Sequence, residues 1–562
     1  MVAGAALTDF AAAVDDFNAQ VAHWNAKITQ ALDDDKKTKA QEIRAEHQGE
    51  FEERPVIQEA AHKASSQLKN WADDSTLKQL WNSGALPASV KDKFPEVDLK
   101  ISDVDTEAGV ESLVNQLINQ GVLPPRARDW DAKDLQRWLK DHPGKAEELA
   151  DSAPSRNAAG IESLLAGLVP SKDADEGQRQ RTKRMNKVRE FFESFDGDDA
   201  ATLAMLFPAQ TGNLNGVPFT NRAQANTINV IAADHKVQRK ISELEREIDE
   251  ERRDADRQNA YGKGKAIQRL QAQISEYEDR QDVYDSILDE NRQLLLFDPA
   301  GDGKIAEIHG TITDDTQNVG TLVPGIGNEM DNFNTTGSRA QAFQDGDQSG
   351  QLTMISWLGG DMPDGVTSGA ASPDHYQDGM AQDLADFSQA VRQEINHSNA
   401  DGNNVETTVA GHSYGGATVG AAENHGLAAD NVLHISSAGL GDGIDSPEDL
   451  PESQDGVDRY SITPDDDYLM HGSRPFLHGD NPDGELTRLE SGDPNGSGEA
   501  SGHSGSLDER GSIAWKNALR VFTGKGDQAQ EYDPEKHVPG AEYGPSKRYP
   551  SPYGGPNPYP HW

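Results

Sequence analysis

Apolar residues in the first 293 positions recur at the three- and four-residue spacing of amphipathic helices. The clearest N-terminal seam consists of Leu7, Phe10, Val14, Phe17, Val21, Trp24 and Ile28. Such a seam packs on a second helix of the same chain or binds a helical partner protein, and both alternatives stay open. We therefore predict an N-terminal helical region over residues 1–84, followed by a region of short helices over residues 85–235.

The most regular helical pattern lies in residues 236–293. Its first seam contains Val237, Ile241, Leu244 and Ile248, and its second contains Ile267, Leu270, Ile274, Tyr277, Tyr284 and Leu288. Gly262-Lys-Gly264 lies between the two seams, so the pattern predicts an antiparallel coiled-coil hairpin that acts as a spacer. Just upstream, the Asn- and Gly-rich residues 203–226 predict a loop that side-chain hydrogen bonds hold in place.

From residue 294 the pattern changes to short apolar runs that alternate with helical segments. The predicted strands are Leu294–Phe297, Ile305–Ile308, Gly320–Val323, Leu352–Trp357, Val405–Ala410, Val432–Ser436, Arg459–Thr463 and Glu485–Leu489. Helices are expected over residues 379–397, after Ser413, and over about 508–522. This alternation predicts an α/β domain over residues 294–525, with a mainly parallel sheet covered by helices on both faces. A Pro/Tyr/Gly-rich tail over residues 526–562 is expected to be disordered or loosely packed.

Composition excludes several classes of function. The net charge of −44 over 562 residues argues against binding to nucleic acid or to anionic membranes. The chain contains no cysteine, which excludes thiol catalysis and Cys-ligated zinc. No apolar run is long enough to span a membrane, and no ordinary signal peptide is visible. The compartment stays undetermined: cytoplasmic by default, with non-classical export open. No cofactor or metal is expected.

The stretch Gly411-His412-Ser413-Tyr414-Gly415 contains the G-x-S-x-G pattern of serine hydrolases. The pattern alone is weak in a chain with 53 glycines, so its context decides. A predicted strand ends at Ala410, and the small residues after Gly415 are typical of a helix that packs close to a sheet. Ser413 is therefore the candidate nucleophile.

A serine nucleophile needs a base, and a carboxylate orients that base. In an α/β-hydrolase the acid and then the histidine follow the serine in the sequence. Three consecutive acids follow the predicted strand that ends at Thr463. Of these Asp467 is preferred, because it lies furthest past the strand end, with Asp466 close behind and Asp465 also open. Of the three downstream histidines, His471, His478 and His503, only His503 lies between the last predicted strand and the last helix.

Negative charge on a substrate carbonyl oxygen requires backbone N–H donors. The amide of Tyr414, directly after the nucleophile, is one candidate. The loop after the strand that ends at Val323 provides the others, namely Gly325, Ile326 and Gly327, since its glycines let the backbone approach a ligand.

Four segments together resemble the actinobacterial α/β-hydrolase family of unknown function called DUF1023. They are "LVPGIGNEMDNF", "VAGHSYGG", the turn at Asp467 and "GHSGSLDERGSIAWKNAL". The likeness covers roughly residues 200–525, because "LFPAQTGNLNGVPFTNRAQAN" is similar to the helical region that often precedes that domain. It implies Ser413 as nucleophile, Asp467 as acid, His503 as base and residues 325–328 as oxyanion loop. The N-terminal seam resembles WXG100-type secretion substrates, although Trp81-Asn-Ser-Gly84 is not a W-x-G motif.

The function expected from these residues is that of a serine esterase, in the 3.1 class of hydrolases, that acts on a small-molecule or lipid ester. The alternative is a non-enzymatic helical interaction protein that uses the hydrolase fold as a scaffold. Acyl transfer to an alcohol instead of water would use the same residues.

Overall fold

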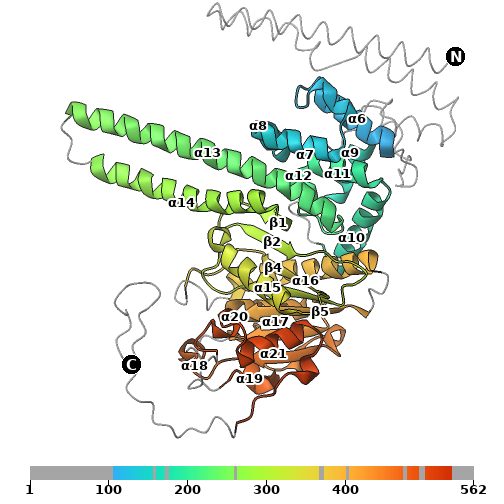
Figure 1. Cartoon of the computed structure of the whole chain (residues 1–562), viewed down its shortest axis with the longest axis vertical. Coiled ribbons are helices and arrows are strands. Elements are labelled where there is room, and N and C mark those ends of the chain that lie inside the picture. Colours follow the sequence, from blue (N-terminus) through green and yellow to red (C-terminus); the bar gives the residue numbers. More distant parts are fainter. Residues whose placement is uncertain are drawn as a thin grey trace, which may run out of the picture.

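The structure is a computed structural model and describes residues 106–155, 160–170, 176–258, 263–365, 373–399, 404–472, 478–492 and 500–534. The predicted N-terminal region and the tail beyond residue 534 lie outside these residues. The described chain forms a helical region followed by an α/β region built on one sheet (Figure 1). None of the described helices is both long and apolar enough to cross a bilayer.

The helical region packs short helices around the first half of a long one. The helices are α6 Thr106–Asn119, α7 Ala132–Asp141, α8 Pro143–Ala150, α9 Gly160–Leu168, α10 Gln178–Glu193, α11 Gly197–Leu206, α12 Pro208–Thr211, α13 Phe219–Gln258 and α14 Lys263–Glu290. Their boundaries follow ordinary capping chemistry. For example, the Asp131 side chain accepts a hydrogen bond from the Asp134 amide at the start of α7, and the Asp196 side chain caps α11 in the same way.

The loop expected over residues 203–226 is much shorter, and helix α13 begins earlier than position 236. The turn spans only residues 212–218, where the Asn213 side chain bonds the backbone of Phe297 in both directions. Residues 219–235 are buried on nearly every side, and buried polar residues such as Asn226 and Asn229 bond backbone carbonyls there. Polar and apolar residues are therefore not separated onto two faces, and the sequence shows no helical period.

Helices α13 and α14 lie side by side as a long hairpin that projects from the body of the molecule (Figure 1). At its base Val283, Tyr284 and Ile287 join the hydrophobic core of the sheet. Further out Ile267 and Ile274 are only half-buried, as expected for two helices with no third partner. That the hairpin is a coiled coil stays a prediction.

Eight strands form the sheet, in the order β1-β2-β4-β3-β5-β6-β7-β8. They are β1 Gln293–Asp298, β2 Lys304–His309, β3 Asn318–Val323, β4 Leu352–Leu358, β5 Glu406–His412, β6 Asn431–Ile435, β7 Asp458–Ile462 and β8 Thr487–Arg488. Strands β1 and β2 are antiparallel to their neighbours, and all other pairs are parallel. The strand expected over 485–489 is shorter, because helix α19 Pro482–Glu485 begins at a proline that fixes a helical φ.

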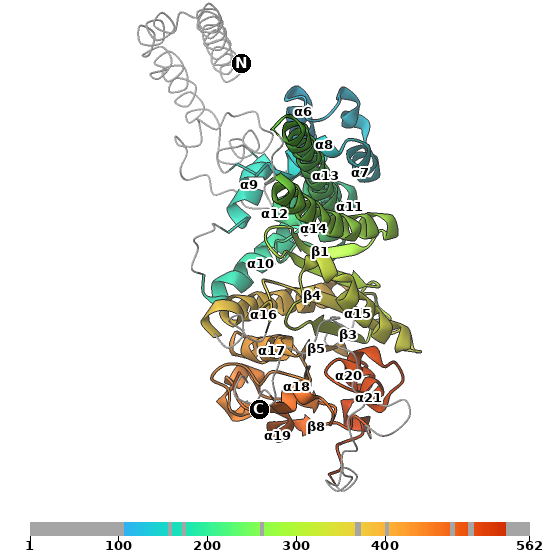
Figure 2. The ribbon, with the colours of Figure 1, turned by 90° about the vertical axis from the view of Figure 1, so that its left-hand side faces the viewer.

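Helices cover both faces of the sheet. Figure 2 shows α16 Pro373–Ser398 and α17 Tyr414–Asn424 on one side, with α15 Asn334–Gly346, α20 Gly505–Asp508 and α21 Ile513–Phe522 on the other. The second face has its own core, in which Phe343 stacks on Trp515 and contacts Phe522. Because β3 to β7 run parallel, their carboxyl ends and the loops that follow them share one edge of the sheet.

The expected loose tail does not begin at residue 526. The Asn517 side chain on α21 fixes the backbone at Gln530, because it donates a hydrogen bond to the Gln530 carbonyl and accepts one from the Gln530 amide. Glu531 also pairs with Leu489 beside the last strand. Residues 526–534 therefore pack on the sheet as part of the domain.

Candidate active site

Ser413 lies on a sharp turn between β5 and α17, at the carboxyl edge of the sheet. Its backbone has φ 57° and ψ −123°, a conformation that is strained for a residue with a side chain. Backbone hydrogen bonds stabilise this conformation: the Ser413 amide donates to the Ile435 carbonyl, and the Ser413 carbonyl accepts hydrogen bonds from the amides of Gly416 and Ala438. A serine in such a turn has its hydroxyl lifted out of the sheet toward the strand ends.

Two glycines let the neighbouring loop approach this turn. A Cβ at Gly415 would lie 2.2 Å from the Pro324 carbonyl oxygen, so only glycine fits there. A Cβ at Gly325 would lie 2.7 Å from the Ser413 Cβ and 3.2 Å from its Oγ. The loop after β3 therefore lies directly against the serine side chain.

Asp467 and His503 form a hydrogen-bonded pair at the same sheet edge. The Asp467 Oδ2 to His503 Nδ1 distance is 2.9 Å, and Asp467 is fully buried. Burial alone would raise the pKa of Asp467. The hydrogen bond and charge of His503, with the Met470 amide that donates to the same carboxylate, outweigh burial and hold the pKa below its usual value. Asp467 is thus an ionised acceptor that can fix the His503 ring.

The two acids before Asp467 have other partners. Asp466 accepts hydrogen bonds from the Gly502 amide at 2.7 Å and the Ser501 hydroxyl at 2.6 Å, so it anchors the loop that carries His503. Asp465 is paired with Arg488.

The alternative histidines are placed differently. His478 is buried and bonds Asp442, 3.1 Å from Nδ1 to Oδ1, with its ring against Tyr414. His471 belongs to α18 Tyr468–Gly472, and its side chain lies outside the described part of the chain.

His412 was not singled out from the sequence, although it belongs to the same pentapeptide as Ser413. Its Nε2 donates to the His503 carbonyl at 2.9 Å, and the two rings lie 4.8 Å apart between centroids. Burial, reinforced by the nearby His503 charge, lowers the pKa of His412 to about 3, so its ring stays neutral. His412 therefore ties the His503 loop to the end of β5, directly before Ser413. Among the described hydrogen bonds none joins Ser413 Oγ to His503, and such contacts are often longer without substrate.

The loop after β3 has its carbonyl groups fixed by asparagine side chains. Asn328 Nδ2 donates to the Gly325 carbonyl at 2.9 Å, and Asn332 Nδ2 donates to the Gly327 carbonyl at 2.8 Å. Because a trans peptide places its N–H opposite its C=O, the Ile326 amide points away from Asn328. The Gly327 amide donates to the Pro363 carbonyl at 2.9 Å, so it is already used. Gly327 therefore does not fit the predicted role of oxyanion donor. Gly325, Ile326 and Tyr414, the last at the N-terminus of α17, remain candidates.

Among the described residues no group of three or more His, Asp or Glu side chains is arranged to hold a metal ion. The groups that the structure brings to this edge are the Ser413 hydroxyl, the His503 imidazole, the Asp467 carboxylate and backbone amides.

Comparison with known proteins agrees with the architecture. Residues 298–471 match the family model Abhydrolase_8, described as alpha/beta hydrolase, while no curated protein matches the chain. The DUF1023 and WXG100 resemblances stay predictions.

Solved structures that match part of the chain include proteins from three bacteria. A serine hydrolase without a lid from Xanthomonas campestris is 14% identical, with 42% of this chain and 94% of that chain covered and a TM-score of 0.26. A putative aryl esterase from Burkholderia cenocepacia is 11% identical, with 42% of this chain and 98% of that chain covered and a TM-score of 0.23. A dienelactone hydrolase from Anabaena variabilis is 14% identical, with 42% of this chain and 99% of that chain covered and a TM-score of 0.22. TM-scores this low carry no argument about fold or chemistry. The matched segment and the mostly parallel eight-stranded sheet around it identify an α/β-hydrolase domain in the C-terminal half of the chain.

Proposed function

We propose that this protein is a serine hydrolase that cleaves an ester through an acyl-enzyme intermediate. In this proposal Ser413 is the nucleophile, His503 the general base and Asp467 the acid that orients the base. The observation that carries the proposal is the strained Ser413 turn at the same sheet edge as the buried Asp467–His503 pair. A scaffold without activity has no need of a strained serine beside an ionised carboxylate and an imidazole.

The first chemical step transfers the acyl group to the enzyme. His503 Nε2 takes the proton of Ser413 Oγ as the oxygen attacks the ester carbonyl carbon. The negative charge that develops on the carbonyl oxygen is stabilised by the amides of Tyr414 and Ile326. The tetrahedral intermediate collapses when the imidazolium gives its proton to the leaving alcohol, which leaves the acyl group on Ser413.

Hydrolysis of the acyl-enzyme then repeats the step with water. His503 takes a proton from water, the hydroxide attacks the acyl carbon, and the proton returns to Ser413 Oγ as the carboxylic acid leaves. Asp467 stays ionised throughout and holds the Nδ1 proton, so that Nε2 faces the serine. An alcohol in place of water would give acyl transfer with the same proton movements.

Labelling with a fluorophosphonate tests the proposal on the purified full-length protein. The expected result is one phosphonyl group on Ser413, located by mass spectrometry, and no labelling of Ser413→Ala. A matched control is Ser349→Ala, since Ser349 is exposed in the turn before β4, at the opposite ends of the parallel strands from Ser413, and should not affect labelling. Labelling of another serine, or none in a folded sample, would favour the scaffold alternative.

A further inference from the structure

A cavity lies where the helical region meets the hydrolase sheet. It has a volume of about 320 Å³, within the size range of small-molecule sites. Its walls come from α10, α13 and the turn before α13 on one side and from β1, β2, β4 and α16 on the other. Figure 2 shows α10 lying against α16 at this junction. The cavity is distinct from the Ser413 turn, and none of its lining residues belongs to the proposed triad.

Arg222 is the unusual residue of this cavity. It is 1% exposed, yet no carboxylate among the described residues lies within ion-pairing distance of it. Its Nε donates to the Gly212 carbonyl at 3.3 Å and its Nη1 to Asn215 Oδ1 at 3.1 Å. Nη2 makes no hydrogen bond within the described part of the chain. Buried guanidinium groups are rarely left without an anion, because their desolvation is costly.

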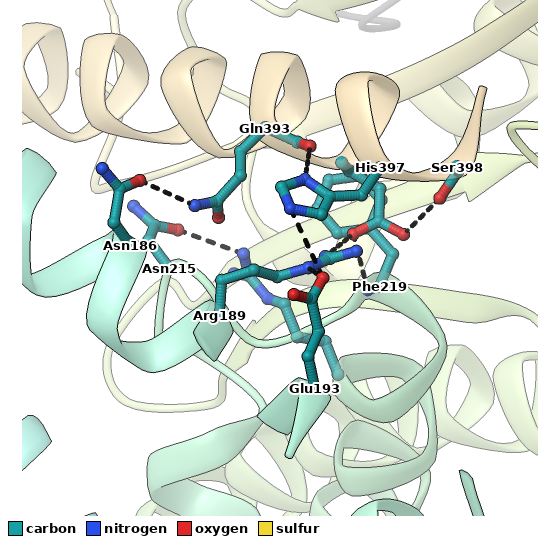
Figure 3. Close-up of polar contacts among 10 residues, drawn as sticks. Asn186, Arg189, Glu193, Asn215, Phe219, Gln393, His397 and Ser398 are labelled. Carbon is teal, nitrogen blue, oxygen red and sulfur yellow. Dashed lines mark hydrogen bonds and ion pairs between the residues drawn. The ribbon is translucent and has the colours of Figure 1, made fainter. Parts of the chain in front are cut away.

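The acid whose charge acts on Arg222 is bonded to other residues. Glu394 on α16 accepts hydrogen bonds from Arg189 Nη1, from the Phe219 amide and from the Ser398 hydroxyl. Figure 3 shows these contacts, together with Asn215, which bonds the guanidinium of Arg222. Two arginines therefore share the neighbourhood of one carboxylate, and Arg189 takes its ion pair. Burial lowers the pKa of Arg222 to about 10 and Glu394 opposes this, so the guanidinium is charged at neutral pH.

A second donor lines the same cavity. Trp357, at the end of β4, is 1% exposed, and its Nε1 has no hydrogen-bond partner in the described structure. Its ring lies 6.3 Å from that of Phe387, which also lines the cavity. The lining thus combines two buried N–H donors that have no hydrogen-bond acceptor among the described residues with aromatic surface.

The remaining charges favour a single negative charge on the ligand. Arg181 is paired with Asp386 at 2.7 Å, and Lys304 with Asp383 at 3.0 Å. Arg184 is paired with Glu176. Asp298, whose carboxylate accepts the Ala300 amide, is a lining acid with no ion pair among the described residues. One unpaired arginine beside one unpaired aspartate disfavours a dianion such as phosphate.

We propose that this cavity binds a small organic carboxylate with an apolar or aromatic body, whose oxygens accept hydrogen bonds from Arg222 Nη2 and Trp357 Nε1. The carboxylate completes the ion pair that Arg222 lacks, and the body packs on Trp357 and Phe387. The site lies along the same sheet edge as Ser413. Strand β4 is two strands from β5, about 10 Å at the usual strand spacing. Binding here requires no ester chemistry at Ser413.

Titration of the full-length protein with 3-phenylpropanoate and its uncharged amide, followed by ligand-observed NMR, tests the proposal. We expect the wild type to bind the carboxylate at least about tenfold more tightly than the amide, as a charge-assisted hydrogen bond would give. Arg222→Met should abolish this preference. Trp357→Phe keeps an aromatic ring but removes Nε1, and should weaken carboxylate binding about fivefold or more.

Trp515→Phe is the matched control. Trp515 is also buried and its Nε1 also lacks a hydrogen-bond partner in the described structure, but it packs in the core on the opposite face of the sheet. Its replacement should leave carboxylate affinity unchanged. Equal affinity for acid and amide in the wild type, or the same carboxylate affinity in Trp357→Phe and Trp515→Phe, overturns the proposal. The second result would also be seen if the acid bound only at Ser413. If Arg222→Met does not fold, the two tryptophan variants alone decide.

Discussion

The assignment of the catalytic acid leads to a prediction that separates two adjacent residues. Asp467→Asn and Asp466→Asn remove the same charge one position apart. In Asp467→Asn the new side-chain amide can donate to His503 Nδ1, which forces the imidazole proton onto Nε2. A protonated Nε2 cannot accept the proton of the serine. Loss of the correct tautomer costs about 10⁴-fold in turnover in serine enzymes of this type. At about 1.36 kcal/mol per factor of ten, this corresponds to roughly 5.5 kcal/mol.

The expected effect of Asp466→Asn is much smaller. Asp466 accepts two hydrogen bonds, from the Gly502 amide and from the Ser501 hydroxyl, and an asparagine oxygen can keep the first. The second involves an exposed serine, so its loss costs about 1 kcal/mol. Even if the whole loss fell on the position of His503, turnover would drop by less than about tenfold. The two variants should therefore differ by roughly three orders of magnitude.

The assay is kcat/KM for a nitrophenyl ester, with thermal melting of each variant to show that it is folded. Asp465→Asn is the matched control from the same run of acids, and we expect it to behave like the wild type because Asp465 is paired with Arg488 and not with His503. The assignment is refuted if Asp466→Asn loses as much activity as Asp467→Asn, or if Asp467→Asn keeps more than about a tenth of wild-type turnover.

Three further predictions follow from packing and charge. Gly325→Ala places a Cβ 2.7 Å from the Ser413 Cβ, so fluorophosphonate labelling should slow at least about tenfold while the melting temperature falls only modestly; unchanged labelling would contradict the close approach of the loop. Burial, followed by the charges of Asp196, Asp198 and Glu107, raises the pKa of Asp199 from 3.8 to about 6. The ionised form is thus disfavoured in the fold, so Asp199→Asn should raise the melting temperature at pH 7.5 but not at pH 3.5, and an equal gain at both would refute this cause. Removing one heptad from each helix beside residues 259–262 should leave ester turnover unchanged, and loss of turnover in a folded variant would show that the arm shapes the site.

The strands were predictable because each is a short apolar run between polar turns, and buried strands leave that pattern in the sequence. Seven of the predicted strands overlap observed strands over most of their length, and the last overlaps the two-residue β8. The start of α13 was missed because buried polar residues, such as Asn226 and Asn229, stand among its apolar ones and hide the helical period.

The finer features of the candidate site depend on contacts between distant segments. Asp466 and Asp467 are chemically identical and adjacent, and the turn in which the Asp467 amide donates to the Pro464 carbonyl decides which one meets His503. The Gly327 amide likewise donates to Pro363, which lies far away in the sequence. Arg222 has no ion pair among the described residues because Arg189 bonds Glu394 on a distant helix. No local pattern reports such contacts, whereas G-x-S-x-G reports a turn because the turn itself requires those residues.

The shared core at the base of the hairpin bears on how the protein unfolds. Phe219 and Val230 of α13 and Tyr284 of α14 pack in one cluster with Leu294 and Phe297 of β1. A cut before β1 would remove the cover of a sheet edge and expose a strand that can pair with other chains. The hydrolase domain expressed alone should therefore aggregate, and the described helical region and the sheet should melt together in a single calorimetric transition. The outer arm lies away from this shared core, so it is free to fray at lower temperature.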